Sequence, residues 1–120
     1  MPVGTVSNGK PQNRKDLAEV IAAHHVPYVA QTTFVQNFRD LHIKSEKALY
    51  TPGAAFLNIM APCPRGWRYN TPDIIDLCKA AVDTCFWPLF ECYDGEKWVV
   101  NYIPKEKLPI EDFLRSQGRF

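Results

Sequence analysis

Hydrophobic residues recur at helical spacing in two segments of the first half of the chain. The first segment predicts an amphipathic helix that begins after Asn13, a good N-cap residue, and ends before Pro27. Its repeating positions are Leu17, Val20, Ile21 and His24. The second predicts a helix that is stopped by Thr51, Pro52 and Gly53. The positions on its packed face are Phe34, Phe38, Leu41, Ser45, Ala48 and Leu49.

Strand-like runs separate and follow these helices. Residues 27–33 form a short β-branched and aromatic run, and residues 54–61 are continuously apolar except for Asn58. Such an apolar run is typical of a strand covered on both faces in a parallel sheet. A third helix is predicted after Thr71 and Pro72, an N-cap and first-turn pair. Its stripe consists of Ile74, Ile75, Cys78, Ala81, Val82 and Cys85.

The last third of the chain predicts a β-hairpin and a tail. Asp94 and Gly95 are interpreted as a two-residue turn between two aromatic-rich strands. The predicted fold class is α/β: a helix-strand-helix-strand-helix core in a partial three-layer sheet, then the hairpin and a short C-terminal helix. One domain is expected over residues 1–120. Its predicted parts are an irregular loop (1–13), the α/β core (14–85), the hairpin (86–103) and a tail (104–120) that packs on a partner chain.

Composition narrows the function classes. Hydrophobic residues make up 46% and charged residues 22% of the chain, and no apolar run approaches the roughly 20 residues of a membrane span. The net charge is +1 without a basic run, so neither nucleic acid nor a membrane is an expected partner. The start of the chain lacks the pattern of a secretory signal, and a cytoplasmic location is therefore expected.

Four cysteines are the main candidates for chemistry. Cys63 stands between Pro62 and Pro64 directly after the apolar run, which predicts an extended loop that displays its thiol. The alternative for Cys63 is a small buried hydrophobe, the usual fate of a free cysteine. Cys78, Cys85 and Cys92 are predicted to be reduced and to lie in the core. His24 and His25 are assigned no chemistry, because no carboxylate or cysteine accompanies them at ligand spacing.

Long segments of the chain support a resemblance to a known family. They are GTVSNGKPQNRKDLAEVIAAHHVPYVAQTTF, PGAAFLNIMAPCPRGW, DTCFWPLFECYDGEKWVVNYIPKEKLPIEDFL and QGRF. The chain resembles the C-terminal part of the β subunit in the family of 2-oxoacid:ferredoxin oxidoreductases, which includes pyruvate:ferredoxin oxidoreductase. The cysteine loop and the QGRF tail are the most specific parts of the match.

The resemblance implies a fold, a reaction and a set of cofactors. The implied fold is of the thiamine-pyrophosphate-binding type, and the implied reaction is oxidative decarboxylation of pyruvate to acetyl-CoA and carbon dioxide. In that family the subunit binds thiamine pyrophosphate with Mg²⁺, and a 4Fe-4S cluster close to it. Cys63 matches a late cysteine of the cluster-binding pattern and is the one metal ligand assigned here. The implied partners are other oxidoreductase subunits, ferredoxin, pyruvate and coenzyme A.

The chain also departs from the family pattern. It has no Gly-Asp-Gly diphosphate motif and no Cys-x-x-Cys, which with one further cysteine would supply the other cluster ligands. It therefore resembles half of a subunit, whose N-terminal half is an expected partner, and is expected to be inactive alone. No catalytic residue is assigned, and the preferred 2-oxoacid is left open. The alternatives are a non-catalytic α/β interaction module that docks another subunit and, less favoured, a small thiol redox protein.

Overall fold

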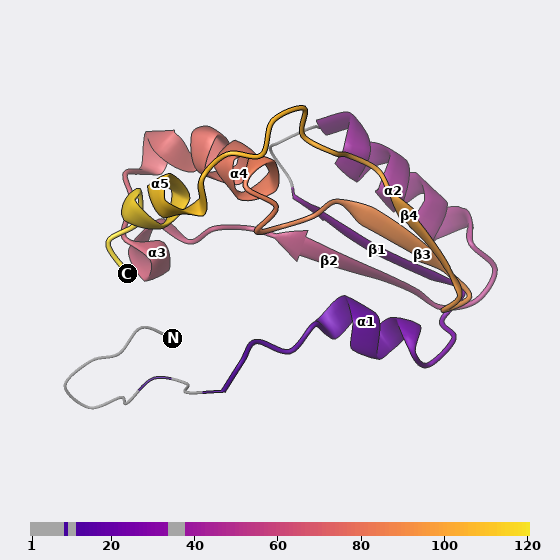
Figure 1. Cartoon of the computed structure of the whole chain (residues 1–120). Helices are drawn as coiled ribbons and strands as arrows, with labels where there is room; N and C mark the ends of the chain where they lie inside the picture. Colours follow the sequence, from indigo (N-terminus) through magenta and orange to yellow (C-terminus); the bar gives the residue numbers. More distant parts are fainter. Residues whose placement is uncertain (1–8, 10–11, 34–37) are drawn as a thin grey trace.

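The computed structural model describes residue 9 and residues 12–33 and 38–120. Most of the loop predicted for residues 1–13, and Phe34 of the predicted second helix, lie outside the described residues. Figure 1 shows an open sheet with helices on both faces and a group of helices beyond one end of it. In the described part of the chain, no helix is both long enough and apolar enough to cross a bilayer.

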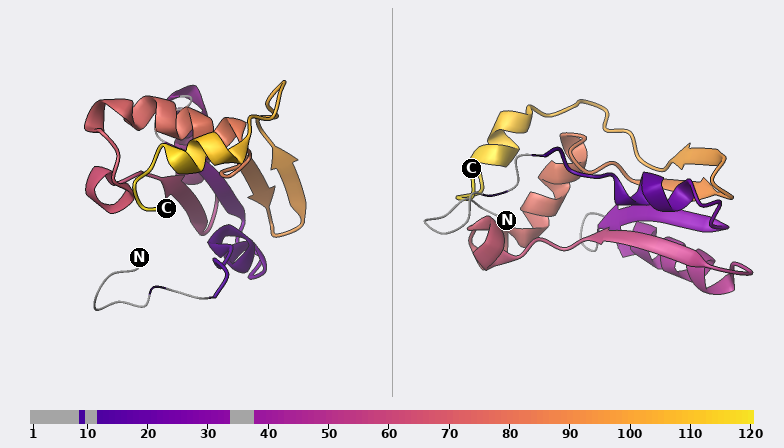
Figure 2. Two further views of the ribbon diagram at one scale, coloured as in Figure 1. Left: turned by 60° about the vertical axis from the view of Figure 1, so that its left-hand side comes forward. Right: turned by 90° about the horizontal axis from the view of Figure 1, so that it is seen from below.

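The sheet has four strands in the order β2-β1-β3-β4. Strands β1 (Tyr28–Thr33) and β2 (Ala55–Met60) are parallel, whereas β3 (Phe90–Tyr93) runs antiparallel to both β1 and β4 (Lys97–Val100). Helix α1 lies on one face and α2 on the other (Figure 2). The helices are α1 (Leu17–Ala22), α2 (Phe38–Tyr50), α3 (Pro64–Trp67), α4 (Ile74–Asp83) and α5 (Ile110–Arg115), with a 3-10 turn at Thr71–Asp73 before α4. The predicted α/β class, with its hairpin and C-terminal helix, is confirmed.

The burial of the two parallel strands is the reverse of the sequence prediction. Strand β1 is buried at all six positions, because it has a strand on each side and a helix on each face. Strand β2 lies at the sheet edge, and most of its residues are at least partly exposed. The prediction that the run after residue 54 is covered on both faces is therefore wrong for β2. The strand that is covered on both faces is β1, although its sequence includes polar residues.

A buried lysine changes the packed face predicted for α2. Lys44 is 1% exposed, whereas Leu49, placed by the sequence on the packed face, is 83% exposed. The Lys44 Nζ atom donates to the backbone oxygen of Gln31 at 2.9 Å and to the Asp40 carboxylate at 2.9 Å. Burial lowers the pKa of Lys44, and the interaction with Asp40 opposes that shift. Because its ammonium group is paired with Gln31 and Asp40, Lys44 can be buried where α2 packs on the sheet.

Two apolar clusters form the core. The smaller one joins α1 to the sheet through Ala18, Ala22, Val29 and Cys92. The larger one lies beyond the sheet and contains Met60, Leu77, Cys78, Ala81, Val82, Trp87, Leu89 and Phe113. Cys78 and Cys92 are therefore core residues, as predicted, but the prediction for Cys85 is wrong. Helix α4 ends at Asp83, and Cys85 is exposed with a left-handed φ of 58°.

A buried carboxylate ties the hairpin to β1 and α2. Glu91 Oε1 accepts hydrogen bonds from Tyr28 Oη at 2.7 Å, Lys47 Nζ at 2.7 Å and Tyr93 Oη at 3.1 Å. Its other oxygen accepts from Asn101 Nδ2 at 2.7 Å. Burial alone would raise the pKa of Glu91, but the hydrogen bonds from Lys47, Tyr28 and Asn101 outweigh it and lower the pKa to about 2.

The hairpin turn is one residue longer than predicted. Tyr93 pairs with Lys97, so three residues connect the strands, and Asp94 (φ 53°) and Gly95 (φ 74°) both adopt the left-handed conformation. Gly95 also lies against the end of α1, where an added β-carbon would overlap the backbone oxygen of Ala22. The backbone of Ala22 thus leaves no room for a side chain at this position, in addition to the left-handed φ of the turn.

Replacing Gly95 with alanine is expected to destabilise the chain by more than about 1 kcal/mol, because the substitution adds both left-handed strain and a steric overlap. Urea unfolding measures this loss of stability. Glu96→Ala, in the same turn but exposed, is the matched control and should change the free energy of unfolding by less than about 0.5 kcal/mol. Equal stability of the two variants would contradict the packing described for Gly95.

Candidate functional site

Cys63 lies just beyond the C-terminal end of β2, at the N-cap position of α3. Its backbone is extended, with φ −93° and ψ 119°, and Pro64 occupies the first turn of α3. Cys63 is exposed, whereas Pro62 before it is buried. The structure therefore confirms that the thiol is displayed on a proline-fixed loop, and the alternative of a buried hydrophobe is wrong.

The surroundings of the thiol leave space on one side. Gly66 follows within α3, and a β-carbon added there would lie 3.8 Å from Cys63 Sγ. The side chain of Trp67, the next residue, instead packs edge-on against Phe113 of α5, with 6.5 Å between ring centroids. A ligand that bound Cys63 would therefore meet a bare backbone position beside the sulfur atom.

The Cys63 loop is closed by hydrogen bonds at both ends. Tyr69 Oη donates to the backbone oxygen of Pro62 at 2.9 Å, and the Trp67 N–H donates to the Cys63 oxygen at 2.9 Å. Arg68 ends α3 in the left-handed conformation, with φ 56°. Burial, followed by the charges of Cys78 and Cys63, raises the pKa of Tyr69, so this hydroxyl remains a hydrogen-bond donor.

The end of the chain packs on this loop. After α5 the tail turns back toward α3, and the C-terminus lies beside α3 (Figures 1 and 2). The Arg119 guanidinium lies 3.6 Å from the centre of the Trp67 ring, and Gln117 is 2% exposed. The sequence suggested a partner chain as the contact of the tail. The structure shows that residues 117–119 contact their own chain. Local sequence patterns do not predict this contact, because Arg119 and Trp67 are 52 positions apart.

The described residues supply an incomplete donor set for a metal. Within residues 9, 12–33 and 38–120, no group of three or more His, Cys, Asp or Glu residues is placed to hold a metal ion. Burial raises the pKa values of Cys78 and Cys92, which disfavours their thiolates. Cys63, an exposed thiol with open space beside it, fits the role of one ligand of a cluster completed by residues from elsewhere.

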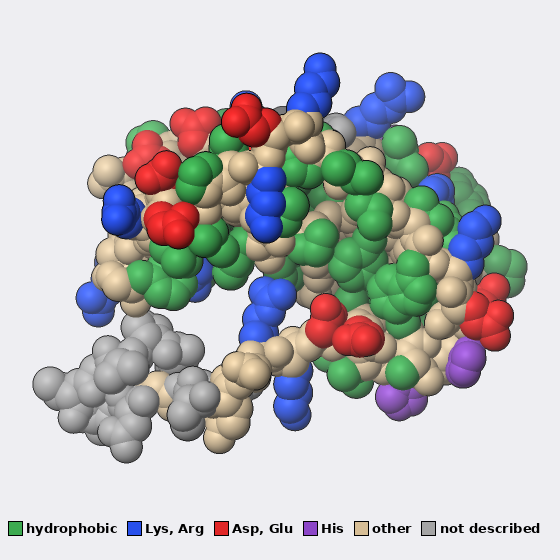
Figure 3. Space-filling model, in the orientation of Figure 1, with side chains coloured by type: hydrophobic (Ala, Val, Ile, Leu, Met, Phe, Trp, Pro, Cys, Tyr) green, Lys and Arg blue, Asp and Glu red, His purple; other side chains and the backbone are tan. Residues whose placement is uncertain are grey.

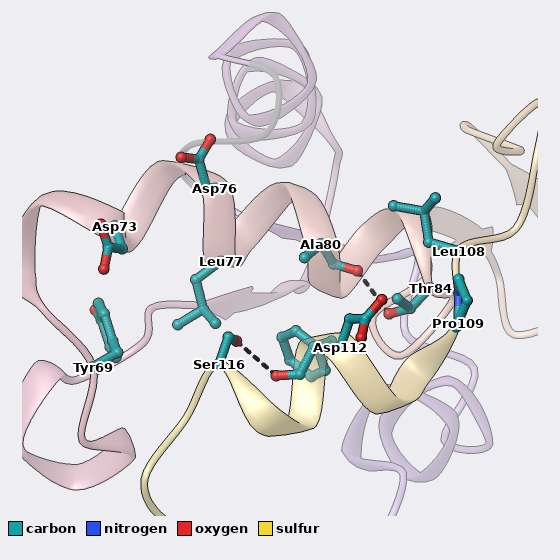
Figure 4. Close-up of a pocket in the computed structure, with 11 residues that line it drawn as sticks. Tyr69, Asp73, Asp76, Leu77, Ala80, Thr84, Leu108, Pro109, Asp112 and Ser116 are labelled. Atoms are coloured by element: carbon teal, nitrogen blue, oxygen red, sulfur yellow. Dashed lines mark hydrogen bonds between the residues drawn. The ribbon is translucent and has the colours of Figure 1, made fainter.

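A separate pocket of about 350 Å³ lies between α4 and α5 (Figure 4). Leu77 and Phe113 contribute apolar surface, and Asp112 contributes a carboxylate. The hydroxyls in the pocket are occupied, since Thr84 donates to the Ala80 oxygen at 2.7 Å and Ser116 to the Phe113 oxygen at 2.8 Å. The pocket therefore offers an apolar surface with acidic groups, and no activated nucleophile.

Comparisons with known proteins match this chain to oxidoreductase subunits. No protein-family model matches it. It is 40% identical over 119 residues to pyruvate synthase subunit PorB of Methanosarcina barkeri, covering 99% of this chain and 40% of that protein. The family resemblance is confirmed. PorB of Thermotoga maritima is also 40% identical, with 99% of this chain and 36% of that protein covered. Ketoisovalerate oxidoreductase subunit VorB of Pyrococcus abyssi is 41% identical over 112 residues, or 91% of this chain and 35% of that protein.

The match concerns only part of each relative. The chain spans between 35% and 40% of the length of these curated relatives, and it is similar to their C-terminal part. Both PorB and VorB match over nearly the whole chain.

Proposed function

We propose that this chain is the C-terminal part of a subunit of a 2-oxoacid:ferredoxin oxidoreductase that acts on pyruvate. In the assembled enzyme, pyruvate and coenzyme A are converted to acetyl-CoA, carbon dioxide and a proton, and the released electron pair reduces ferredoxin. The similarity to PorB over 99% of the chain supports this class. The observation that carries the proposal is the exposed Cys63 thiol on its proline-fixed loop at the C-terminal end of β2.

Cys63 supplies one thiolate to a 4Fe-4S cluster in this proposal. The remaining ligands come from the part of the subunit that the chain lacks, because the described residues form no complete metal site. Ligands of open α/β sheets lie at the carboxyl ends of parallel strands, which is where Cys63 stands. Pro62 and Pro64 restrict the backbone on both sides, so the thiol approaches from a fixed direction.

Thiamine pyrophosphate and its Mg²⁺ would be held by the same missing part, since this sequence has no Gly-Asp-Gly motif. When bound, thiamine stabilises the carbanion formed on decarboxylation, and the cluster transfers electrons. The contribution of this chain is to position Cys63 and to pack against the cofactor-binding part. Catalytic residues that contact the 2-oxoacid are expected outside this chain.

Pyruvate is proposed as the substrate because of the family resemblance and not because of the percentages of sequence identity. The chain is 40% identical to a protein named for pyruvate and 41% identical to one named for ketoisovalerate. These values do not discriminate between the two acids. Assays of the assembled enzyme with both acids are therefore part of the test.

A second candidate function is a non-catalytic α/β module that docks another subunit. Large apolar side chains are exposed on β4 and in the segment that follows it, among them Trp98, Val100 and Ile103. Hydrophobic side chains gather over the hairpin in Figure 3. A surface of this kind fits a protein partner, and either candidate function uses it. The two differ in whether Cys63 binds iron.

The chain alone is expected to hold neither a complete cluster nor thiamine pyrophosphate, because it offers one suitable thiolate and no magnesium motif. Anaerobic reconstitution with iron, sulfide, thiamine pyrophosphate and Mg²⁺ should leave it colourless. Together with the rest of its subunit and the partner subunits, it should support ferredoxin reduction that depends on pyruvate and coenzyme A. A stoichiometric brown cluster on the chain alone would contradict the one-ligand proposal. An assembly that keeps its full iron content when Cys63 is replaced by alanine would favour the docking module.

A further inference from the structure

We propose that the tail residues Gln117, Gly118 and Arg119 are positioning residues that brace α3 and thereby fix the direction of the Cys63 thiol. This inference rests on the proposed role of Cys63 as a cluster ligand. It concerns different residues, which lie more than 50 positions away in the sequence. We call these three residues the tail brace.

The first contact of the tail brace is a cation over an aromatic ring. The Arg119 guanidinium lies 3.6 Å from the centre of the Trp67 ring, and its Nε donates to Gln117 Oε1 at 2.7 Å. Gln117 is itself buried, and its Nε2 donates to the backbone oxygen of Phe113 in α5 at 2.7 Å. Both ends of the Gln117 amide are therefore engaged, and they hold the guanidinium plane against Trp67.

The second contact joins the two backbones directly. The Gly118 N–H donates to the Arg68 oxygen at 2.9 Å, at the residue that ends α3. A β-carbon at Gly118 would lie 3.0 Å from Arg68 Cβ and 3.2 Å from the Arg68 oxygen. The close approach of the two segments therefore depends on glycine at this position.

These contacts reach Cys63 through a very short helix. Helix α3 has four residues. Trp67, whose ring contacts the Arg119 guanidinium, also donates its backbone N–H to the Cys63 oxygen at 2.9 Å. A single helical turn is unstable alone, since forming the first turn fixes several residues for one hydrogen bond. Tertiary contacts must hold α3 in place, and the tail brace supplies two of them.

The orientation of Cys63 matters because groups around a metal ligand tune the site. Outer contacts orient the ligands that bind the metal, and the reduction potential of an iron-sulfur cluster depends on its surroundings. A loosened α3 lets the Cys63 backbone rotate and changes how its thiolate approaches the cluster. The tail brace therefore affects the cluster without touching it.

The test uses the assembled enzyme with Arg119→Ala, which removes the stack, and Arg119→Lys, which keeps a cation but not the planar fork. Arg115→Ala, an exposed arginine in the last turn of α5, is the matched control. Hydrogen exchange should be about 5- to 10-fold faster at the Trp67 amide in Arg119→Ala, partly restored in Arg119→Lys and unchanged in Arg115→Ala. Trp67→Phe, which keeps a smaller ring, provides a milder disruption if Arg119→Ala does not assemble.

The decisive readouts are the low-temperature EPR spectrum and the midpoint potential of the cluster. Both should shift in Arg119→Ala and return toward wild type in Arg119→Lys. Faster exchange at Trp67 with an unchanged spectrum and potential would overturn the inference, as would unchanged exchange. If the cluster is lost in Cys63→Ala but unaltered in Arg119→Ala and Trp67→Phe, the tail brace alone is wrong. If the cluster is intact in Cys63→Ala, the proposed function itself fails.

Discussion

Replacing Cys63 with alanine in the assembled enzyme is expected to lower ferredoxin reduction by at least about 100-fold. Loss of an outer partner of a metal ligand already costs about 10- to 100-fold in affinity or activity, so loss of the ligand itself should cost more. The remaining thiolates would hold an incomplete cluster or none. Iron analysis, low-temperature EPR of the reduced enzyme and a ferredoxin-coupled assay measure the three consequences.

Decarboxylation should be less affected than electron transfer in this variant. Carbanion stabilisation belongs to thiamine, whose binding motifs are absent from this chain, so a single turnover should still release carbon dioxide. Cys85→Ala is the matched control, because Cys85 is the other exposed cysteine of the described residues. It should retain full iron content and activity. Wild-type iron content and ferredoxin reduction in Cys63→Ala would show that Cys63 is an ordinary surface thiol and not a cluster ligand.

Replacing Glu91 with alanine is expected to destabilise the fold by about 3 kcal/mol, the second large effect. The substitution removes an acceptor that four donors share, and it leaves the Tyr28 hydroxyl without a partner in the core. Breaking a buried ion pair costs about 3 to 5 kcal/mol, and the lower end applies because Lys47 is 42% exposed and can be hydrated. Urea unfolding measures the change, with Glu96→Ala as the exposed control.

The same carboxylate predicts the acid sensitivity of the chain. The pKa of Glu91 is lowered from 4.5 to about 2 in the folded state. A lowered carboxyl pKa means that the unfolded chain takes up the proton more readily, so the stabilisation is fully present above the unfolded value near 4.5. It is then lost progressively as the pH falls toward 2. Stability measured between pH 6 and 2 should therefore fall less steeply in Glu91→Ala, and equal slopes would contradict this account.

Local patterns predicted the strands and helices α1, α2, α4 and α5, but neither α3, where an extended loop was expected, nor which strand would be central. The apolar run around Phe56 looked like the most buried strand, yet it forms the sheet edge. Strand β1 carries Gln31, Thr32 and Thr33 and is nevertheless buried. Its polar groups are bonded across elements: Gln31 Nε2 donates to the Pro88 oxygen at 3.0 Å, for example. Sequence spacing contains no information on such partners.

The candidate site was predictable in part. The flanking prolines predicted that the Cys63 thiol is displayed, because they act locally on the backbone. The contact between Arg119 and Trp67 was not predictable, since it depends on how α5 packs against α3 and α4. The misplacement of Cys85 has a similar origin: a stripe of apolar spacing continues past the residue at which α4 ends.

Anomalous diffraction at the iron edge from crystals of the assembled enzyme would show directly whether Cys63 is a ligand of the cluster. We expect an iron atom within bonding distance of Cys63 Sγ, with the other protein ligands of that cluster supplied by the part of the subunit that precedes this sequence in its relatives. A cluster whose ligands all come from elsewhere, with Cys63 Sγ facing solvent, would show that Cys63 is not a cluster ligand.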